Sequence, residues 1–347
     1  MTWLPLLLSD SSAALRYLVL KELLAKDDKD KEVIELEALR FEDPIITTLL
    51  EKQNDDGSWD TSDNLGLQMN KIRNTAQAMF RLSYLGIRKK HPSIQKAANY
   101  LFSQQLEDGA WPREDNGKLA FNRSVHGPII SPLQTAFPLR ALAMCGYATD
   151  TRAEKGYKWL IDYRAEDGSW PTFISPDGKT AYQPVGYRQL PNSRFGCRSN
   201  STGALLAFAY HPERRTSDIA KRVLDLLLAR ETRDRRFLGL EVARTIGIEP
   251  AHGFLTYFGR YDLSLILNLT WRIGASMEDP RVSDLVKYLK EIQGSYGLWE
   301  YMNNPIASRW ITYDILQSLS KIDETSDWIS TEPRTIYRSY PRKPRRF

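Results

Sequence analysis

The stretch that decides the fold is "QNDDGSW" (Gln53 to Trp59), because the chain repeats it. Related stretches are "QLEDGAW" (105–111), "RAEDGSW" (164–170) and, more loosely, "QGSYGLW" (293–299). Each copy ends one segment whose apolar residues have helical spacing and precedes another such segment. A motif that returns along the chain in this way indicates an array of similar helix pairs rather than a set of unrelated elements.

The residue types of the motif indicate a mechanical role. Asp-Gly favours a sharp turn, because glycine adopts the positive φ that many helix exits require. The Trp is a large apolar plate that a neighbouring repeat can bury, and the Gln amide can bond to backbone groups left open at a helix end. We therefore interpret each copy as a turn that ties one helix pair to the next.

The apolar spacing predicts about five outer and six inner helices and no strand. The gap before the copy at 293 is about twice the others, and a degenerate turn at 227–237 is expected to fill it. The predicted inner helices are 12–26, 70–87, 134–147, 201–212, 261–275 and 308–322. The predicted outer helices are one that follows "DDKDKEV" and runs to Gln53, and those at 91–105, 150–164, 217–232 and 279–293.

These repeats are similar to the QW repeats of the terpenoid cyclases, such as squalene–hopene cyclase, and of protein prenyltransferase β subunits. The resemblance runs from about residue 12 to 323 and includes "RYDLSLIL" and "SRWITYDIL". It implies an all-α protein with the α/α toroid fold, an (α/α)5–6 barrel in which inner helices lie inside a ring of outer helices. We expect one toroid domain over 1–330 and a basic tail over 331–347.

Composition is ordinary for a globular protein of 347 residues, and its two cysteines, Cys145 and Cys197, are too few for a disulfide framework. No signal peptide or membrane-spanning apolar run is evident, so a cytoplasmic location is predicted. The net charge of +5 arises in the tail, which we expect to be solvated and able to contact anionic lipid. No specific nucleic-acid partner is expected, and the oligomeric state is left open. The basic residues of the tail are Arg334, Arg338, Arg342, Lys343, Arg345 and Arg346.

The resemblance also implies a chemistry. A class II terpenoid cyclase protonates an alkene or epoxide with an aspartic acid and stabilises the resulting carbocations with aromatic faces. The Asp-x-Asp-Asp signature of that family is absent from this sequence, which leaves Asp262 and Asp314 on inner helices as the catalytic candidates. The alternative for Asp262 is a helix N-cap. Asp314 lies deeper in its helix and faces either the lumen or a packing partner.

Candidate substrate-binding residues come from the long links and the last inner helices. The links 112–133, 171–200 and 238–259 are expected on one face, with the mouth of a cavity at 171–200. Arginines there suit a diphosphate or a carboxylate, and aromatic residues suit an apolar lining. The alternatives are salt bridges between repeats and ordinary core packing. The candidates are Tyr187, Arg188, Arg194, Arg198, Tyr257, Tyr261, Trp310 and Tyr313.

No metal or cofactor is expected. The acidic string "DDGSWD" (Asp55 to Asp60) lies inside the structural turn, which accounts for its aspartates. Cys197 with His126, His211 or His252 has the ligand types that zinc prefers, but not the tight ligand spacing of a zinc motif.

The leading hypothesis is an isoprenoid-handling protein, most like a terpenoid cyclase, that acts on or binds a long apolar prenyl-type substrate in a central cavity. One alternative is a non-catalytic toroid that binds lipid or another protein. Another is a glycan-active toroid enzyme, which needs two carboxylates about 5–9.5 Å apart in one cleft. Glu241, Glu300 and Asp314 are the candidates for that pair.

Overall fold

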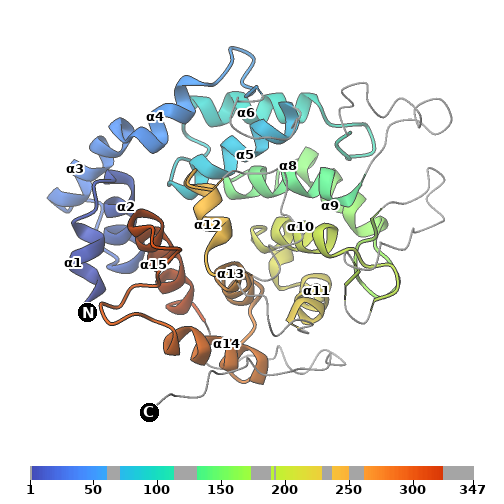
Figure 1. The fold of residues 1–347 in the computed structure, drawn as a ribbon. Helices are drawn as coiled ribbons and strands as arrows, with labels where there is room; N and C mark the ends of the chain where they lie inside the picture. Colours follow the sequence, from blue (N-terminus) through green and yellow to red (C-terminus); the bar gives the residue numbers. More distant parts are fainter. Residues whose placement is uncertain are drawn as a thin grey trace.

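The fold is described from a computed structural model that covers residues 2–60, 71–112, 131–172, 189–190, 193–228, 237–249 and 262–322. Within these ranges the regular structure is helical, with three isolated β-bridges and no strand. Figure 1 shows the helices arranged as an inner and an outer ring. The prediction of an all-α protein with an α/α toroid fold is confirmed.

Six segments form the inner ring, and they match the predicted inner helices. These segments are largely buried; α10, for example, buries all but one of its residues, polar ones included. The first inner helix continues as a π-helical turn, Val19–Leu23. The segments are α2 (Ala13–Leu18), α5 (Lys71–Tyr84), α8 (Pro132–Met144), α10 (Arg198–Ala209), α13 (Leu263–Ile273) and α15 (Pro305–Leu319).

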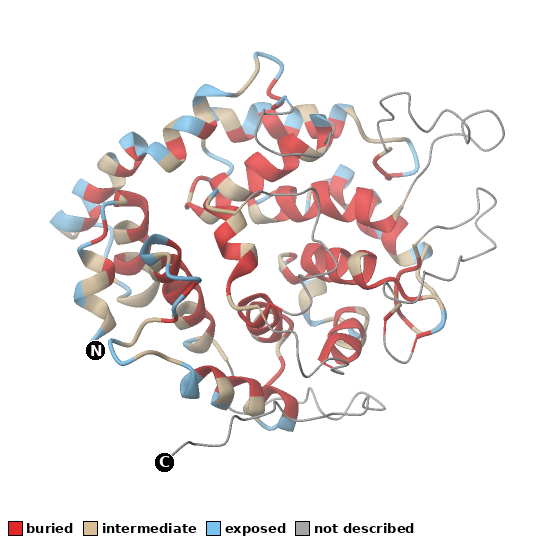
Figure 2. Cartoon of the chain, viewed as in Figure 1, coloured by how far each residue is buried: buried red, intermediate tan, exposed pale blue. Residues whose placement is uncertain are grey.

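The outer helices each have one apolar face, which they pack on the inner ring (Figure 2). The single outer helix predicted to run to Gln53 is two helices, α3 and α4. The break occurs because the Asp43 carboxylate accepts the Ile45 N–H as an N-cap and Pro44 starts a new helix. The outer helices are α3 (Lys31–Leu39), α4 (Pro44–Glu51), α6 (Pro92–Ser103), α9 (Thr151–Asp162), α11 (Asp218–Leu228) and α14 (Pro280–Glu291), and a short α1 (Trp3–Leu8) precedes the ring.

The repeated turns are held by the same hydrogen bonds in all four copies. Each Trp indole N–H donates to the carbonyl of a leucine ten residues earlier, at the end of the outer helix, over 2.7–2.8 Å. The backbone N–H of the same Trp donates to a hydroxyl on the next inner helix. The interpretation of these motifs as ties between helix pairs is confirmed. The four Trp residues are Trp59, Trp111, Trp170 and Trp299, and the hydroxyls belong to Thr75, Thr135, Ser201 and Thr312.

The Gln and Gly of the motif extend the tie to the following outer helix. The Gln53 amide donates both to the Gly57 carbonyl inside the turn and to the Ser93 carbonyl in α6, at 3.1 and 2.9 Å. Gly57 has a φ of +87°, and a Cβ there would lie 2.5 Å from the carbonyl of Lys96. Only glycine can therefore occupy this position without displacing α6.

The centre of the ring contains a helix that the sequence did not predict. This helix, α12 (Leu240–Thr245), belongs to the link 238–259, and Figure 1 shows it surrounded by α5, α8, α13 and α15. Arg140 of α8 forms an ion pair with Glu241 at 2.9 Å, and the Arg81 Nε of α5 donates to the Thr245 carbonyl at 2.6 Å. A link that was expected to lie on a rim therefore sends a helix into the lumen.

Among the described helices, none combines the length and the apolarity that crossing a bilayer requires. The basic tail of 331–347 lies outside the described residues.

Candidate functional site

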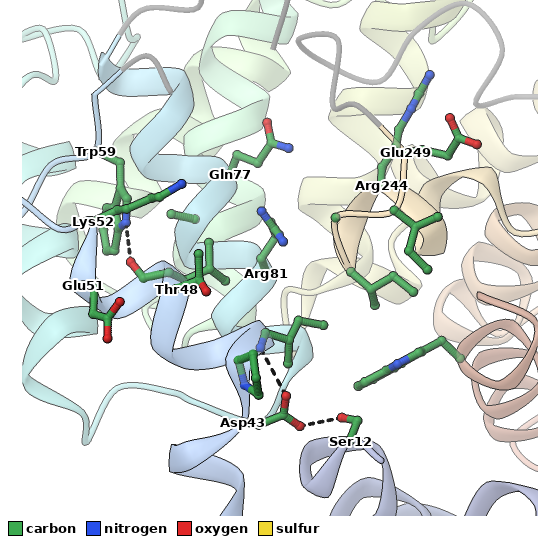
Figure 3. Close-up of a pocket in the computed structure, with 18 of the residues that line it drawn as sticks. Ser12, Asp43, Thr48, Glu51, Lys52, Trp59, Gln77, Arg81, Arg244 and Glu249 are labelled. Carbon is green, nitrogen blue, oxygen red and sulfur yellow. Dashed lines mark hydrogen bonds between the residues drawn. The ribbon is translucent and has the colours of Figure 1, made fainter. Parts of the chain in front are cut away.

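A cavity of 1310 Å³ lies between α4, α5, α12 and α15 (Figure 3). Beside it, α5 and α15 are in contact through Tyr84 and Trp310, whose ring centroids lie 6.0 Å apart. Apolar side chains line part of the cavity, and polar and charged side chains of α4, α5, α12 and the segments next to them line the rest. The apolar lining consists of Pro44, Ile45, Leu49, Trp59, Ala78, Ile246, Ile248, Ile306 and Trp310.

The polar side chains of α5 lie on one face of that helix. Asn74, Gln77 and Arg81 are three, four and seven residues apart, which is the spacing of a single helical face. Asn74 and Gln77 are only 6% and 7% exposed. Neither amide atom of Asn74, nor the Gln77 carbonyl oxygen, has a hydrogen-bond partner within the described residues. Buried amides without partners are costly, so this face is suited to a polar ligand group.

Arg81 brings a positive charge into the same cavity. Its Nε bonds to the Thr245 carbonyl, and Figure 3 shows the side chain extending from α5 toward the middle of the cavity. Burial lowers the pKa of Arg81 to about 10, which leaves it charged at neutral pH. Gly247, with a φ of +83°, makes room for the guanidinium: a Cβ there would lie 2.7 Å from Arg81 Nη2.

The inward-facing carboxylates of the cavity are held by other groups. Asp10 pairs with Arg309 at 3.0 Å. Asp43 accepts the Ser12 hydroxyl and the Ala14 N–H (Figure 3 draws the first of these bonds). Glu249 accepts the Tyr301 hydroxyl at 3.0 Å. At the rim, Asp60 pairs with Lys71 and Glu51 is exposed to solvent.

Asp262, one of the two catalytic candidates, caps two helices. Its carboxylate accepts the Ser264 N–H at the start of α13 and the Gly239 and Glu241 N–H groups at the start of α12. Burial raises the pKa of Asp262 to about 6, and these backbone donors oppose the rise. The N-cap alternative for Asp262 is confirmed, and the side chain also fixes α12 to the ring.

Asp314, the other candidate, is buried next to Asp262. The Ser264 hydroxyl donates to Asp314 while the Ser264 N–H donates to Asp262, so one residue bridges the two carboxyls. Burial raises the pKa of Asp314 to about 6; the Ser264 hydroxyl opposes this rise and the charge of Asp262 adds to it. The rings of Tyr84, Trp310 and Tyr313 pack around this point with centroids 6.0–6.5 Å apart. Neither aspartate lines the cavity.

Four of the predicted binding residues are described. Trp310 lines the cavity, and Tyr313 is buried with its hydroxyl accepting the Gln317 amide. Arg194 is exposed over the Phe195 ring, whereas Arg198 is buried and donates to the Gln189 carbonyl. The described residues of 171–200, where the mouth was expected, do not line the cavity. The predicted residues Tyr187, Arg188, Tyr257 and Tyr261 lie outside the described residues.

The described residues also bear on the possibility of a zinc site at Cys197. Cys197 is buried before α10, and His211 pairs with Glu154 at 2.9 Å. The described ranges hold no group of three or more His, Cys, Asp or Glu residues that could bind a metal ion; His126 and His252 lie outside these ranges.

The three carboxylates considered for glycan chemistry do not share the cavity. Glu241 is paired with Arg140, Glu300 is exposed beside the last turn, and Asp314 is buried at the aromatic cluster. None of the three is among the residues that line the cavity between α4, α5, α12 and α15.

Comparison with known proteins places the chain near the terpenoid cyclases. Residues 10–178 match the family described as the squalene-hopene cyclase C-terminal domain. Squalene–hopene cyclases of Zymomonas mobilis and Bradyrhizobium diazoefficiens are 35% and 30% identical over 126 and 128 residues, which is 36% of this chain but only 18% of each cyclase. The type II terpene cyclase MstE from Scytonema is 14% identical, with a TM-score of 0.32, over 80% of this chain and 95% of that one. The sequence matches confirm that the chain is terpenoid-cyclase-like.

Proposed function

We propose that the protein handles an isoprenoid, binding a long apolar prenyl chain in the cavity between α4, α5, α12 and α15. The observation that carries the proposal is the apolar wall formed by Trp59, Ile246 and Trp310 in a cavity of 1310 Å³. Small-molecule sites typically occupy roughly 300–1,000 Å³, so the space suits a long ligand. Burial of a prenyl chain there contributes on the order of 25 cal/mol per Å² of apolar surface. The match to the squalene-hopene cyclase domain supports the same ligand class.

Asp314 does not line the cavity; within this proposal it is the proton donor to a prenyl chain that reaches past Trp310 to the aromatic cluster. A carboxyl with a pKa of about 6 is partly protonated near neutral pH, and burial among aromatic rings removes competing water. Trp310 connects the two places, because it lines the cavity and also packs against Tyr84 and Tyr313 beside Asp314. Aromatic faces in this position stabilise a carbocation by cation–π attraction. Asp262, whose carboxylate holds three backbone N–H groups, is assigned to capping.

The remaining sequence-based assignments stay predictions. These are the ligand contacts of Tyr187, Arg188, Arg194, Arg198, Tyr257 and Tyr261, the cytoplasmic location, and contact of the tail with anionic lipid.

Ligand binding is tested first by extraction and then by titration. The protein is purified, extracted with organic solvent and analysed by mass spectrometry for isoprenoids, and farnesol is titrated into the stripped protein by calorimetry. Ile306→Glu places a charge on a 54% exposed residue at the cavity rim and is expected to weaken farnesol binding about tenfold or more; Ile34→Glu, at a 56% exposed residue outside the cavity, is the matched control. Equal binding by both variants, or no isoprenoid binding by the wild type, would reject the proposal.

The catalytic role is tested on the same protein with Asp314→Asn. Prenyl compounds that the wild type binds are incubated with both proteins, and cyclised or hydrated products are sought by mass spectrometry. We expect product only from the wild type, with binding retained in the variant. Binding without any product from the wild type would leave a carrier, and would remove Asp314 from the proposal.

A further inference from the structure

The polar face of α5 indicates which end group the ligand carries. We infer that Arg81, together with Asn74 and Gln77, forms a site for an oxyanion, a carboxylate or a phosphate, beside α12 in the cavity. This inference rests on the proposed function and narrows it: the ligand is a prenyl compound that ends in an anionic group.

Arg81 carries a largely buried positive charge. Its Nε is engaged by the Thr245 carbonyl, but no ion pair joins the guanidinium to a carboxylate in the described part of the chain. Burial alone lowers its pKa, with no described anion raising it again. Taking a cation out of water without a counter-ion is costly, and an anionic ligand would remove that cost.

The inward-facing acids of the cavity have partners of their own. Asp10 is paired with Arg309, Asp43 with Ser12 and backbone N–H groups, and Glu249 with the Tyr301 hydroxyl. Asp60 and Glu51 lie at the solvent-facing rim. The carboxylates of the cavity outnumber its basic side chains, but the inward-facing ones are already bonded to other groups. Arg244 and Lys52 also line the cavity, and among these basic side chains Arg81 lies on the same helical face as the buried amides. Its guanidinium fork can bind an oxyanion in two-point geometry.

Two amide side chains lie on the same face of α5 as Arg81. Asn74 and Gln77 are more than nine-tenths buried, they line the same cavity, and the Asn74 amide has no hydrogen-bond partner among the described residues. The unpartnered Asn74 N–H₂ group and the Arg81 guanidinium lie on one helical face and supply donors, which is what an oxyanion requires; Gln77 contributes an amide beside them. Figure 3 shows Gln77 and Arg81 extending into the same space.

The test compares three ligands with the same prenyl chain: farnesyl diphosphate, farnesoic acid and farnesol. Calorimetry on the wild type is expected to give a Kd at least about tenfold lower for an anionic ligand than for farnesol. Arg81→Gln should abolish this preference while leaving the Kd of farnesol within about twofold. The control, Arg215→Gln, removes an arginine that also bonds a backbone carbonyl, that of Arg272, outside the cavity, and should keep the preference.

The outcomes separate the two proposals. If all three ligands bind equally to the wild type, or if Arg81→Gln keeps the preference, the anion site is rejected and the isoprenoid proposal stands. If none of the three binds, the isoprenoid proposal fails, and the anion site of a prenyl ligand fails with it. Whichever of the diphosphate and the carboxylate binds more tightly identifies the source of the oxyanion.

A competition on the unaltered protein makes the test independent of how the variants fold. Inorganic pyrophosphate and acetate are added to the wild type before farnesyl diphosphate and farnesoic acid. The anion site predicts that either competitor weakens the binding of the prenyl anions and leaves farnesol unaffected. Competition against farnesol to the same extent would overturn it.

Discussion

The repeated turns and the central helix α12 are two regions that are held in place by different kinds of interaction. Each turn is tied by hydrogen bonds between neutral groups, and the indole bond spans only ten residues of chain. The helix α12 is held by charged side chains from far along the chain: Arg140 and Glu241 are 101 residues apart, and Arg81 and Thr245 are 164 apart. The repeated turns are therefore tied locally by neutral groups, the unrepeated α12 is tied by charged side chains from across the ring, and residues of both regions line the cavity.

The largest effect is expected from the scaffold. Trp111→Ala removes a fully buried indole and its bond to the Leu101 carbonyl, and should lower the free energy of unfolding by about 3–5 kcal/mol. Chemical denaturation measures the change, and it should be the same at pH 5 and pH 7 because no charge is involved. Tyr296→Ala, at a 72% exposed residue, is the control and should change stability by less than about 0.5 kcal/mol. A small effect of Trp111→Ala would show that the repeated turns contribute little to the stability of the ring of helices.

Breaking the central ion pair should cost somewhat less. Arg140→Met leaves Glu241 without its cation and should lower the free energy of unfolding by about 3 kcal/mol. The double variant Arg140→Met with Glu241→Leu should recover most of that loss, because both charges are then absent. If the double variant is no more stable than Arg140→Met alone, α12 is held by something other than this pair.

The pH dependence of stability should distinguish the centre from the turns. Asp314 has a pKa of about 6 in the folded protein and 3.8 as its ordinary value, so the folded state binds the proton more tightly. The contribution of the protonated Asp314 carboxyl to the free energy of unfolding is fully present below about pH 4 and is lost as pH rises through 6. Asp314→Asn should therefore gain about 2–3 kcal/mol relative to the wild type between pH 4 and pH 7. Parallel pH profiles for the two proteins would contradict the raised pKa.

The smallest effect should come from the amide of a turn. Gln105→Ala removes two hydrogen bonds, to the carbonyls of Gly109 and Arg152, and should cost about 1 kcal/mol. The neighbouring Gln104→Ala, whose amide bonds only the exposed Ser103 hydroxyl, is the matched control and should be close to neutral. Equal losses in the two variants would mean that the bridge to α9 contributes nothing.

Much of the fold was predictable because its signals are local. Helical spacing placed the inner helices near their observed bounds, and the Asp-Gly-x-Trp turns placed the connections between helix pairs. The outer helix before Gln53 was predicted as a single helix. Asp43 and Pro44 were not recognised as the N-cap and the first residue of a second helix. The candidate site was predicted less well. Asp262 and Asp314 were found as acids of inner helices, but the polar face of Asn74, Gln77 and Arg81 was not, although its spacing is visible in "NTAQAMFR".

The sequence by itself determined the repeat, its turns and the terpenoid-cyclase-like character of the chain, because each rests on residues within one helix pair. The tertiary structure alone decided that a helix from the link 238–259 enters the ring, that Asp262 caps it, and that Arg81 faces a cavity. These features depend on groups that meet across the ring from distant parts of the chain. No local sequence pattern indicates these contacts, because they form only when the ring of helices brings distant segments of the chain together.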